Sequence, residues 1–298
     1  MKIKTAVKEY LVDIEIRKYS PRTISVAKTK LRDFEIFCHK EFDIVDMDDV
    51  MPRLIKEYTI YMMRKDWKGT TINNYLKTLK SFIQYCYDED FGGFDAKKGG
   101  FKWVKEEKTV ITTFTKRDVK LLLDSCAGNN FYDIRDYAVL TVLFETGVRC
   151  FEMCGIKPED IKEDYILIRG KNNKQRVVPI TPLMKKAFMR YDRVKESFFE
   201  YKTTDKEYFL SRSGRALNNA SVQMIMRERG KGIEGVRVSP HTCRHFFAQQ
   251  QIKMGTDIYT ISRLLGHENL SITQVYLNSL KDADIIKLSK GNSVLMSM

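Results

Sequence analysis

The sequence predicts a mainly α-helical protein with a small β-sheet, built from an all-α N-terminal domain and a mixed α/β C-terminal domain. Apolar residues recur at helical spacing through residues 1–91. Residues 92–113 contain two glycine pairs and many charged side chains, which is typical of a domain boundary. Residues 165–180 alternate β-branched and polar residues around a turn, which indicates a β-hairpin. We therefore predict domains at 1–91 and 114–298, joined by a linker at 92–113.

Four helices are expected in the N-terminal domain. The first runs from about Lys4 to Lys18, and the second begins at Ser20, which can cap it, with Pro21 in the first helical position. The third begins near Asp49 and the fourth near Thr70, each with its apolar residues on one face. The last two helices carry a group of basic residues that suit either the phosphates of a nucleic acid or an ordinary solvated face: Arg64, Lys65, Lys68, Lys77 and Lys80.

The C-terminal domain is expected to begin with a capped helix at Thr115. A strongly apolar helix from Tyr132 to Thr146 should form part of its core. Arg149 follows directly, between two apolar segments. Burying a guanidinium there is costly unless it binds an anion or pairs with an acidic neighbour, for which Glu145 and Glu152 are the candidates.

Further along the chain, we expect the hairpin at 165–180, a helix from Pro182, a short strand at 208–210 and a helix near Asn219 to Arg229. Residues 281–298 form a tail with an apolar end, which is either disordered or a docking peptide for another protein. The hairpin carries four basic residues that are either solvated or suited to a DNA groove: Arg169, Lys171, Lys174 and Arg176.

Three short helices are predicted between residues 239 and 276, a segment that holds three of the four histidines. Residues three and four apart on the first helix share a face. The turn after the second helix and the third helix bring further polar groups near that face. The side chains expected to lie together are His241, Arg244 and His245 on the first helix, His267 after the second and Tyr276 on the third. Such a group can hold a phosphate and attack it.

Composition narrows the function classes. A formal net charge of +13 and a pI near 9.3 favour a polyanionic partner, usually nucleic acid, over a generally basic solvated surface. We expect a cytoplasmic protein, because no signal peptide and no membrane-spanning apolar run is present. The six cysteines contain no CxxC pair, so we interpret them as buried apolar residues and not as disulfides or a zinc site.

Four stretches of the chain together resemble the tyrosine recombinase (phage integrase) family: TGVRCFEMCGIKPEDI, RGKNNKQRVVPI, SPHTCRHFFA and LLGHENLSITQVY. Every expected residue type is present in the family's order, including the nine-residue step from His267 to Tyr276. The specific similarity covers about residues 114–280, and the organisation is similar to compact two-domain Xer-type recombinases and simple integrases. The resemblance implies a helical core-binding (SAM-like) DNA-binding domain, a catalytic domain, and six catalytic residues: Arg149, Lys171, His241, Arg244, His267 and Tyr276.

The resemblance also implies a reaction. Tyr276 would attack a DNA phosphodiester and form a 3′-phosphotyrosyl bond, while Arg149 and Arg244 clamp the phosphate oxygens. The two family histidines would donate to the same oxygens or manage the proton of the nucleophile, and Lys171 would protonate the leaving 5′-oxygen. The covalent bond conserves the energy for rejoining, so no metal, ATP or other cofactor is expected. The partners implied are double-stranded recombination sites and a homotetramer on DNA, with a related recombinase as a further candidate. The purpose would be integration or excision of a mobile element, or dimer resolution.

Three alternatives stay open at this point. The first is a type IB topoisomerase-like enzyme that relaxes DNA, and the second is a DNA-binding protein without catalysis. The third is a zinc hydrolase with His241, His245 and His267 as ligands. In that reading Thr242 stands where a general-base glutamate is needed, and Arg244 sets a cation against the metal. Within the recombinase interpretation, His245 is expected to be a packing residue.

Overall fold

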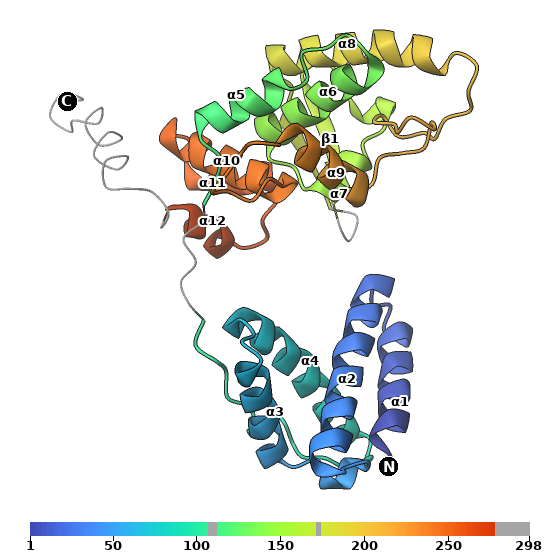
Figure 1. Ribbon diagram of the computed structural model, residues 1–298, viewed down its shortest axis with the longest axis vertical. Coiled ribbons are helices and arrows are strands. Elements are labelled where there is room, and N and C mark those ends of the chain that lie inside the picture. Colours follow the sequence, from blue (N-terminus) through green and yellow to red (C-terminus); the bar gives the residue numbers. More distant parts are fainter. Residues whose placement is uncertain (107–111, 171–173, 278–298) are drawn as a thin grey trace, which may run out of the picture. The chain divides into compact units, whose positions relative to one another are not determined.

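The computed structural model describes residues 1–106, 112–170 and 174–277 (Figure 1). The chain divides into two compact units, Met1–Thr109 and Val110–Met298. Within the described residues both units are built mainly from helices, and the second also contains one two-stranded sheet. This confirms the predicted fold class, mainly α with a small β-sheet.

The first unit is all-α in the residues described. Ser20 begins its second helix by accepting a hydrogen bond from the backbone N–H of Thr23 at 3.2 Å. The third helix begins at Pro52 and not near Asp49, because Met47–Asp49 forms a separate 3-10 turn, η1. The four predicted helices are confirmed: α1 (Ile3–Ile16), α2 (Pro21–Phe42), α3 (Pro52–Arg64) and α4 (Gly69–Asp88).

The segment after α4 packs on the first unit. Ala96 is fully buried, and Phe94, Phe101 and Val104 lie against the same apolar cluster as the four helices. The side chain of Asn73 on α4 donates to the carbonyl of Val104 at 2.9 Å and accepts from its N–H, also at 2.9 Å. Apolar residues of the stretch predicted as a linker over 92–113 therefore pack on the helical core as far as Val104.

The second unit is organised around α6, whose central residues are completely buried. Helix α8 lies along α6, and helix α10 also contacts α6. Burial on all sides explains why α6 shows apolar residues around its whole circumference. The helices are α5 (Lys116–Asp124), α6 (Phe131–Thr146), α7 (Cys150–Cys154), α8 (Pro182–Phe199), α9 (Asn219–Arg229), α10 (Pro240–Lys253), α11 (Ile258–Leu265) and α12 (Leu270–Leu277), with a 3-10 turn η2 at Pro158–Asp160.

The predicted hairpin is confirmed as two antiparallel strands. Strand β1 (Tyr165–Arg169) pairs with β2 (Gln175–Pro179), so that Ile166 stands opposite Val178. Both of these side chains are fully buried, as is Ile168, and they anchor the sheet to the core. The hairpin is thus fixed at its base.

The strand predicted at 208–210 is wrong. In the described part of the chain, this stretch makes only an isolated bridge between Leu210 and Ala216. The backbone N–H of Leu210 instead donates to the hydroxyl of Tyr191 at 3.0 Å. Tyr208 and Phe209 are buried and pack their rings against α8. Aromatic packing, and not pairing with a second strand, accounts for the apolar run.

All six cysteines are free, and five of them are buried, as expected from their spacing. None of the helices described is both long and apolar enough to cross a membrane.

Candidate active site

Helices α10, α11 and α12 are held together by an apolar cluster of their own. Phe247, Ile252, Ile261 and Leu265 form this cluster with the ring of Tyr276, which is only 3% exposed. The hydroxyl of Ser239 caps α10 by accepting from the N–H of Thr242 at 3.3 Å. The cluster therefore fixes the tyrosine ring, while the polar groups of the three helices meet around its hydroxyl.

Arg244 is buried and is held by backbone carbonyls. Its Nη1 donates to the carbonyl of Gly147 at 2.8 Å, and its Nη2 donates to that of Leu265 at 2.7 Å. These carbonyls end α6 and α11, where the helix dipole is negative. Arg244 forms no ion pair with a carboxylate in the described ranges. Burial, together with Arg149, lowers the pKa of Arg244 to about 10, so it stays charged at neutral pH. A buried cation without an acidic partner suits an anionic substrate.

Gly147 is required where it presents its carbonyl. Its φ of +60° lies in the left-handed region that favours glycine. A Cβ added there would come within 2.5 Å of the ring of Phe247 and 2.9 Å of a methyl of Leu265. The absence of a side chain thus lets α6 end directly against α10.

Glu152 is shared by two arginines. It accepts from the N–H and Nη1 of Arg149 at 2.8 and 3.0 Å, and from Nη1 and Nη2 of Arg176 at 3.0 and 2.7 Å. Arg149 also donates to the carbonyl of Gly266 at 3.3 Å, and Arg176 to that of Leu264 at 2.7 Å. Burial alone would raise the pKa of Glu152, but the hydrogen bonds and charges of the two arginines lower it below its usual value.

The arginine side chains around Glu152 carry more positive charge than this one carboxylate neutralises. Together with Arg244, three guanidiniums surround one carboxylate. The side chain of Arg149 is 43% exposed, whereas those of Arg176 and Glu152 are 14% and 1% exposed. Arg149 is therefore paired and oriented by its acidic neighbour, and part of its side chain remains exposed.

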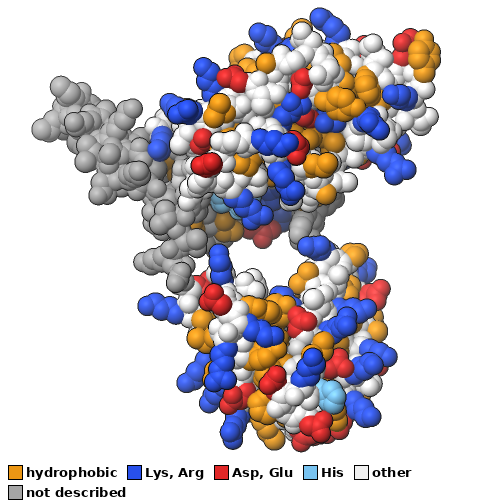
Figure 2. Space-filling view, in the orientation of Figure 1, with side chains coloured by type: hydrophobic (Ala, Val, Ile, Leu, Met, Phe, Trp, Pro, Cys, Tyr) orange, Lys and Arg blue, Asp and Glu red, His pale blue; other side chains and the backbone are white. Residues whose placement is uncertain are grey.

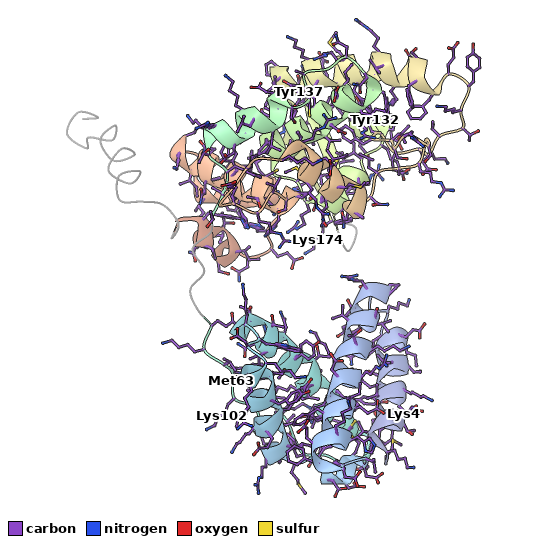
Figure 3. The ribbon with its side chains drawn as sticks, viewed as in Figure 1. Lys4, Met63, Lys102, Tyr132, Tyr137 and Lys174 are labelled. Carbon is purple, nitrogen blue, oxygen red and sulfur yellow. The ribbon has the colours of Figure 1, made fainter. Side chains whose placement is uncertain are left out.

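Both arginines of the hairpin form ion pairs within the second unit. Arg169 donates from Nε and Nη2 to Asp160, at 3.1 and 2.7 Å, and Arg176 is the partner of Glu152. Lys174, labelled in Figure 3, pairs with Glu268 at 2.6 Å. Both hairpin arginines are therefore paired with carboxylates of the second unit, and their side chains are 50% exposed for Arg169 and 14% exposed for Arg176. Lys171 lies outside the described residues.

The hydroxyl of Tyr276 lies 3.1 Å from Nδ1 of His245. It also hydrogen-bonds the guanidinium of Arg244. Burial raises the pKa of Tyr276, and the positive charges of Arg244 and Arg149 partly offset that effect. The ring of His267 lies almost parallel to that of Tyr276, with centroids 6.3 Å apart, and the ring of His241 is 4.2 Å from that of His245. Four of the other five predicted residues, all except Lys171, thus lie around the phenol of Tyr276.

The three histidines of the site are neutral at neutral pH. Burial and nearby arginines lower the pKa of His267 to about 4, and burial with His241 and Arg244 lowers that of His245 to about 4. The pKa of His241 is also lowered, by desolvation and by Arg244, Arg237 and Arg149. Nδ1 of His267 is 2.7 Å from the hydroxyl of Thr273, which orients the ring. Each ring can therefore donate one hydrogen bond and accept another.

Sequence reasoning missed two side chains and two carbonyls of the site. His245 was expected to pack, yet it contacts the phenol. The only signal in the sequence is the helix face that it shares with His241 and Arg244. Arg176 was predicted only as one of four basic hairpin residues that are either solvated or suited to a DNA groove. The carbonyls that hold Arg244 leave no signal in residue types. Within the described residues, no group of three or more His, Cys, Asp or Glu side chains is arranged to hold a metal ion.

Comparison with known proteins decides the family. A model of the phage integrase family matches residues 112–282, more than half of the chain. The chain belongs to this family. A second model, the phage integrase SAM-like domain, matches residues 4–97. Tyrosine recombinase XerC of Thermodesulfovibrio yellowstonii is 30% identical over 278 residues, which span 91% of this chain and 90% of the relative.

Solved structures show the same fold. The XerH recombinase bound to a palindromic difH substrate has a TM-score of 0.72 at 18% identity, over 92% of this chain and 80% of that chain. The Tn1549 transposon integrase in complex with transposon right-end DNA has a TM-score of 0.73 at 17% identity, over 97% of this chain and 99% of that chain. The protein is a site-specific tyrosine recombinase. Such an enzyme exchanges DNA strands through a covalent tyrosine intermediate.

Proposed function

We propose that Tyr276 is the nucleophile of this recombinase and that it attacks a DNA phosphodiester held by Arg149 and Arg244. The observation that carries the proposal is the place of the phenol, which touches a buried guanidinium that has no carboxylate partner in the described residues. A phosphodiester bound there would bring its own negative charge to Arg244. The attacking oxygen would then lie beside the phosphorus, and the product would be a 3′-phosphotyrosyl bond.

The two arginines have different parts in this proposal. Arg244 is fixed from behind by carbonyls, so its remaining N–H groups are rigidly aimed. Arg149 is half exposed and is oriented by Glu152. His241 and His267, neutral at neutral pH, would donate to the same non-bridging oxygens. Loss of one such donor commonly costs about 10²- to 10³-fold in rate.

Lys171 is proposed to protonate the leaving 5′-oxygen. It follows Gly170 in the sequence, between the residues of β1 and those of β2, and it lies outside the described residues. A substrate with sulfur at the bridging 5′ position has a leaving group that needs no proton. For Lys171→Ala we expect slow cleavage of ordinary DNA and near-normal cleavage of the sulfur substrate, measured as covalent adduct. An equal defect on both substrates would exclude Lys171 from the acid role.

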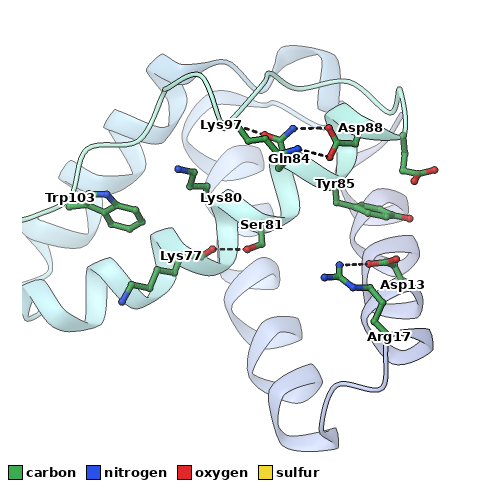
Figure 4. A pocket seen from close by; sticks show the side chains of 11 residues that line it. Asp13, Arg17, Lys77, Lys80, Ser81, Gln84, Tyr85, Asp88, Lys97 and Trp103 are labelled. Atoms are coloured by element: carbon green, nitrogen blue, oxygen red, sulfur yellow. Dashed lines mark hydrogen bonds and ion pairs between the residues drawn. The ribbon is translucent and has the colours of Figure 1, made fainter. Parts of the chain in front are cut away.

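The substrate is proposed to be double-stranded recombination-site DNA, as in the titles of the XerH and Tn1549 complexes. Lysine and arginine side chains are spread over the visible face of each unit (Figure 2). In the first unit, a cavity of about 580 Å³ has Lys77 and Lys80 beside the half-exposed Trp103 (Figure 4). Two of the three acidic residues that line this cavity are paired, Asp13 with Arg17 and Asp88 with Lys97, and the third is Glu89. Its two remaining lysines suit backbone phosphates.

We further propose that four copies act together on two sites, with a related recombinase as an alternative partner. The family and the whole-length similarity to a XerC recombinase support this assembly. The purpose would be integration or excision of a mobile element, or dimer resolution. A DNA substrate and bacterial relatives also support the expected cytoplasmic location.

Covalent trapping tests the nucleophile. Nicked site DNA that loses a short fragment after cleavage should leave a protein–DNA adduct in a denaturing gel. Tyr276→Phe should abolish the adduct and change DNA affinity by no more than a few-fold. Tyr259→Phe is the matched control, because Tyr259 is 61% exposed on α11 and should leave the adduct unchanged. An adduct formed by the Tyr276 variant would overturn the assignment.

A further inference from the structure

His245 contacts the hydroxyl of Tyr276 but has no role in the function proposed above. Its Nδ1 lies 3.1 Å from the hydroxyl of Tyr276. It stands one residue after Arg244 on α10 and, at i+4, on the same face as His241. The contact joins α10 to α12, so it depends on the packing of these helices and not on a surface rotamer.

The direction of this contact follows from the tautomer of His245. A guanidinium can only donate, so the phenol oxygen must accept from Arg244. The phenol can still donate its own hydrogen to a neighbouring acceptor. Nδ1 of His245 is an acceptor within reach when the ring carries its proton on Nε2. The phenol is thus held between a donor on one side and an acceptor on the other.

We propose that His245 is a further catalytic residue, the general base that takes the proton of Tyr276 through Nδ1. The inference rests on the proposed function, in which Tyr276 is the nucleophile. As the phenol oxygen forms its bond to phosphorus, the O–H electrons move into that bond and the proton passes to Nδ1. The phosphorus–O5′ bond breaks at the same time, and the leaving oxygen takes a proton from the general acid. On rejoining, the 5′-hydroxyl attacks, and His245 returns the proton to the tyrosine.

The surroundings keep His245 ready for this role. His241 and Arg244 face it from α10, and Tyr276 faces it from α12. Burial and these neighbours lower the pKa of His245 to about 4, so the ring is neutral and its Nδ1 lone pair is free of a proton. A bound phosphodiester offsets the charge of Arg244 and makes the ring more basic just when a base is needed.

Two variants separate a base from a mere hydrogen-bond partner. His245→Ala removes both functions, whereas the amide oxygen of His245→Asn can accept the phenol's hydrogen bond near the Nδ1 position without taking a proton. We expect both to slow single-turnover cleavage of the trapped substrate by about 10²-fold or more, while DNA binding changes by no more than a few-fold. Added imidazole should restore part of the rate of His245→Ala. His39→Ala is the control, because His39 lies exposed on α2 in the other unit.

The outcomes are distinct. Cleavage by His245→Asn within a few-fold of the parent would overturn the base role, because hydrogen bonding alone would then suffice. Slow cleavage by His245→Ala that imidazole does not improve would also overturn it. The nucleophile assignment is tested separately by Tyr276→Phe on the same DNA. If that variant is inactive while the His245 variants cleave normally, only the present inference fails.

Discussion

At the scale of single residues, the site depends on one carboxylate that serves two guanidiniums. Glu152 connects Arg149, which we propose binds the phosphate, to Arg176, which donates to the carbonyl of Leu264. Removing one member of a buried charged group leaves the others uncompensated, which commonly costs about 3–5 kcal/mol. Because Arg149 is partly solvated, the cost here should lie at or below the lower end of that range.

Glu152→Gln tests this arrangement. The amide keeps the size of the side chain and removes its charge, so Arg149 and Arg176 repel each other and Arg149 loses its orientation. We expect the free energy of unfolding to fall by about 2–3 kcal/mol in urea titrations and adduct formation to slow at least about tenfold. Glu159→Gln, on an exposed residue of η2, should change neither quantity. A Glu152→Gln protein with normal stability and cleavage would show that the shared carboxylate does not orient Arg149.

The two histidines beside the tyrosine predict the acid sensitivity of the fold. In the folded protein the pKa values of His245 and His267 are lowered to about 4, against about 6.5 in an unfolded chain. Between these values the unfolded chain binds more protons, so stability is full above pH 6.5 and falls as the pH drops toward 4. We expect the Tm to decrease from pH 7.5 to pH 5, and the double variant His245→Asn, His267→Asn to show a smaller decrease. Equal decreases in both proteins would contradict this origin.

At the scale of elements, helix ends build the site. Gly266 ends α11 with a φ of +66°, and an added Cβ would lie 2.9 Å from Nη1 of Arg176. That guanidinium is the end of a long side chain and can move, but moving it disturbs its bonds to Glu152. A change at the end of α11 that displaces Arg176 should therefore also change the position of Arg149, because both arginines bind Glu152.

A pair of glycine substitutions separates backbone strain from this contact. Gly266→Ala and Gly255→Ala both place a side chain at positive φ, which costs about 1–2 kcal/mol, but a Cβ on Gly255 meets nothing within 4 Å. We expect both variants to lose similar stability in thermal unfolding and only Gly266→Ala to slow adduct formation, by about tenfold. If the two variants cleave equally well, α11 and Arg176 are not coupled to the reaction.

The elements themselves could largely be predicted from the sequence, because their signals are local. Ser20 with Pro21, and Ser239 with Pro240, give helix starts that the structure confirms. The strand at 208–210 could not be judged in the same way. Its apolar run is equally suited to pairing and to packing, and only the position of Tyr191, far along the chain, decides between them.

The candidate site was predictable in residue type but not in its connections. The order and spacing of the family motifs identify Arg149, Arg244 and Tyr276 in the sequence, so their common site could be predicted. The bond between His245 and the phenol depends on how α12 returns to α10, which no local pattern records. Likewise, Arg176 lies two residues before the buried Val178 on β2, and this strand pattern does not record that its partner is Glu152.

At the scale of the whole molecule, the first unit closes its own core only with the segment beyond α4. Ala96, Val104 and the paired bonds of Asn73 complete that core. A fragment of residues 1–106 should unfold cooperatively by circular dichroism. A fragment of residues 1–91 should melt about 10 °C lower or more, since a loss of 1 kcal/mol moves the Tm of a small domain by about 4–8 °C. Equal melting temperatures would return residues 92–106 to the role of a plain linker.

The support of Arg244 has a consequence for how this enzyme can be altered. The groups that grip it belong to the main chain, which carries no titratable proton and is common to every amino acid. Neither acid nor the replacement of a partner side chain can remove these hydrogen bonds to Arg244. An alanine scan would therefore detect Arg244 itself but not the two carbonyl groups that bind it. Only changes that shift the ends of α6 and α11, above all at Gly147, would expose them.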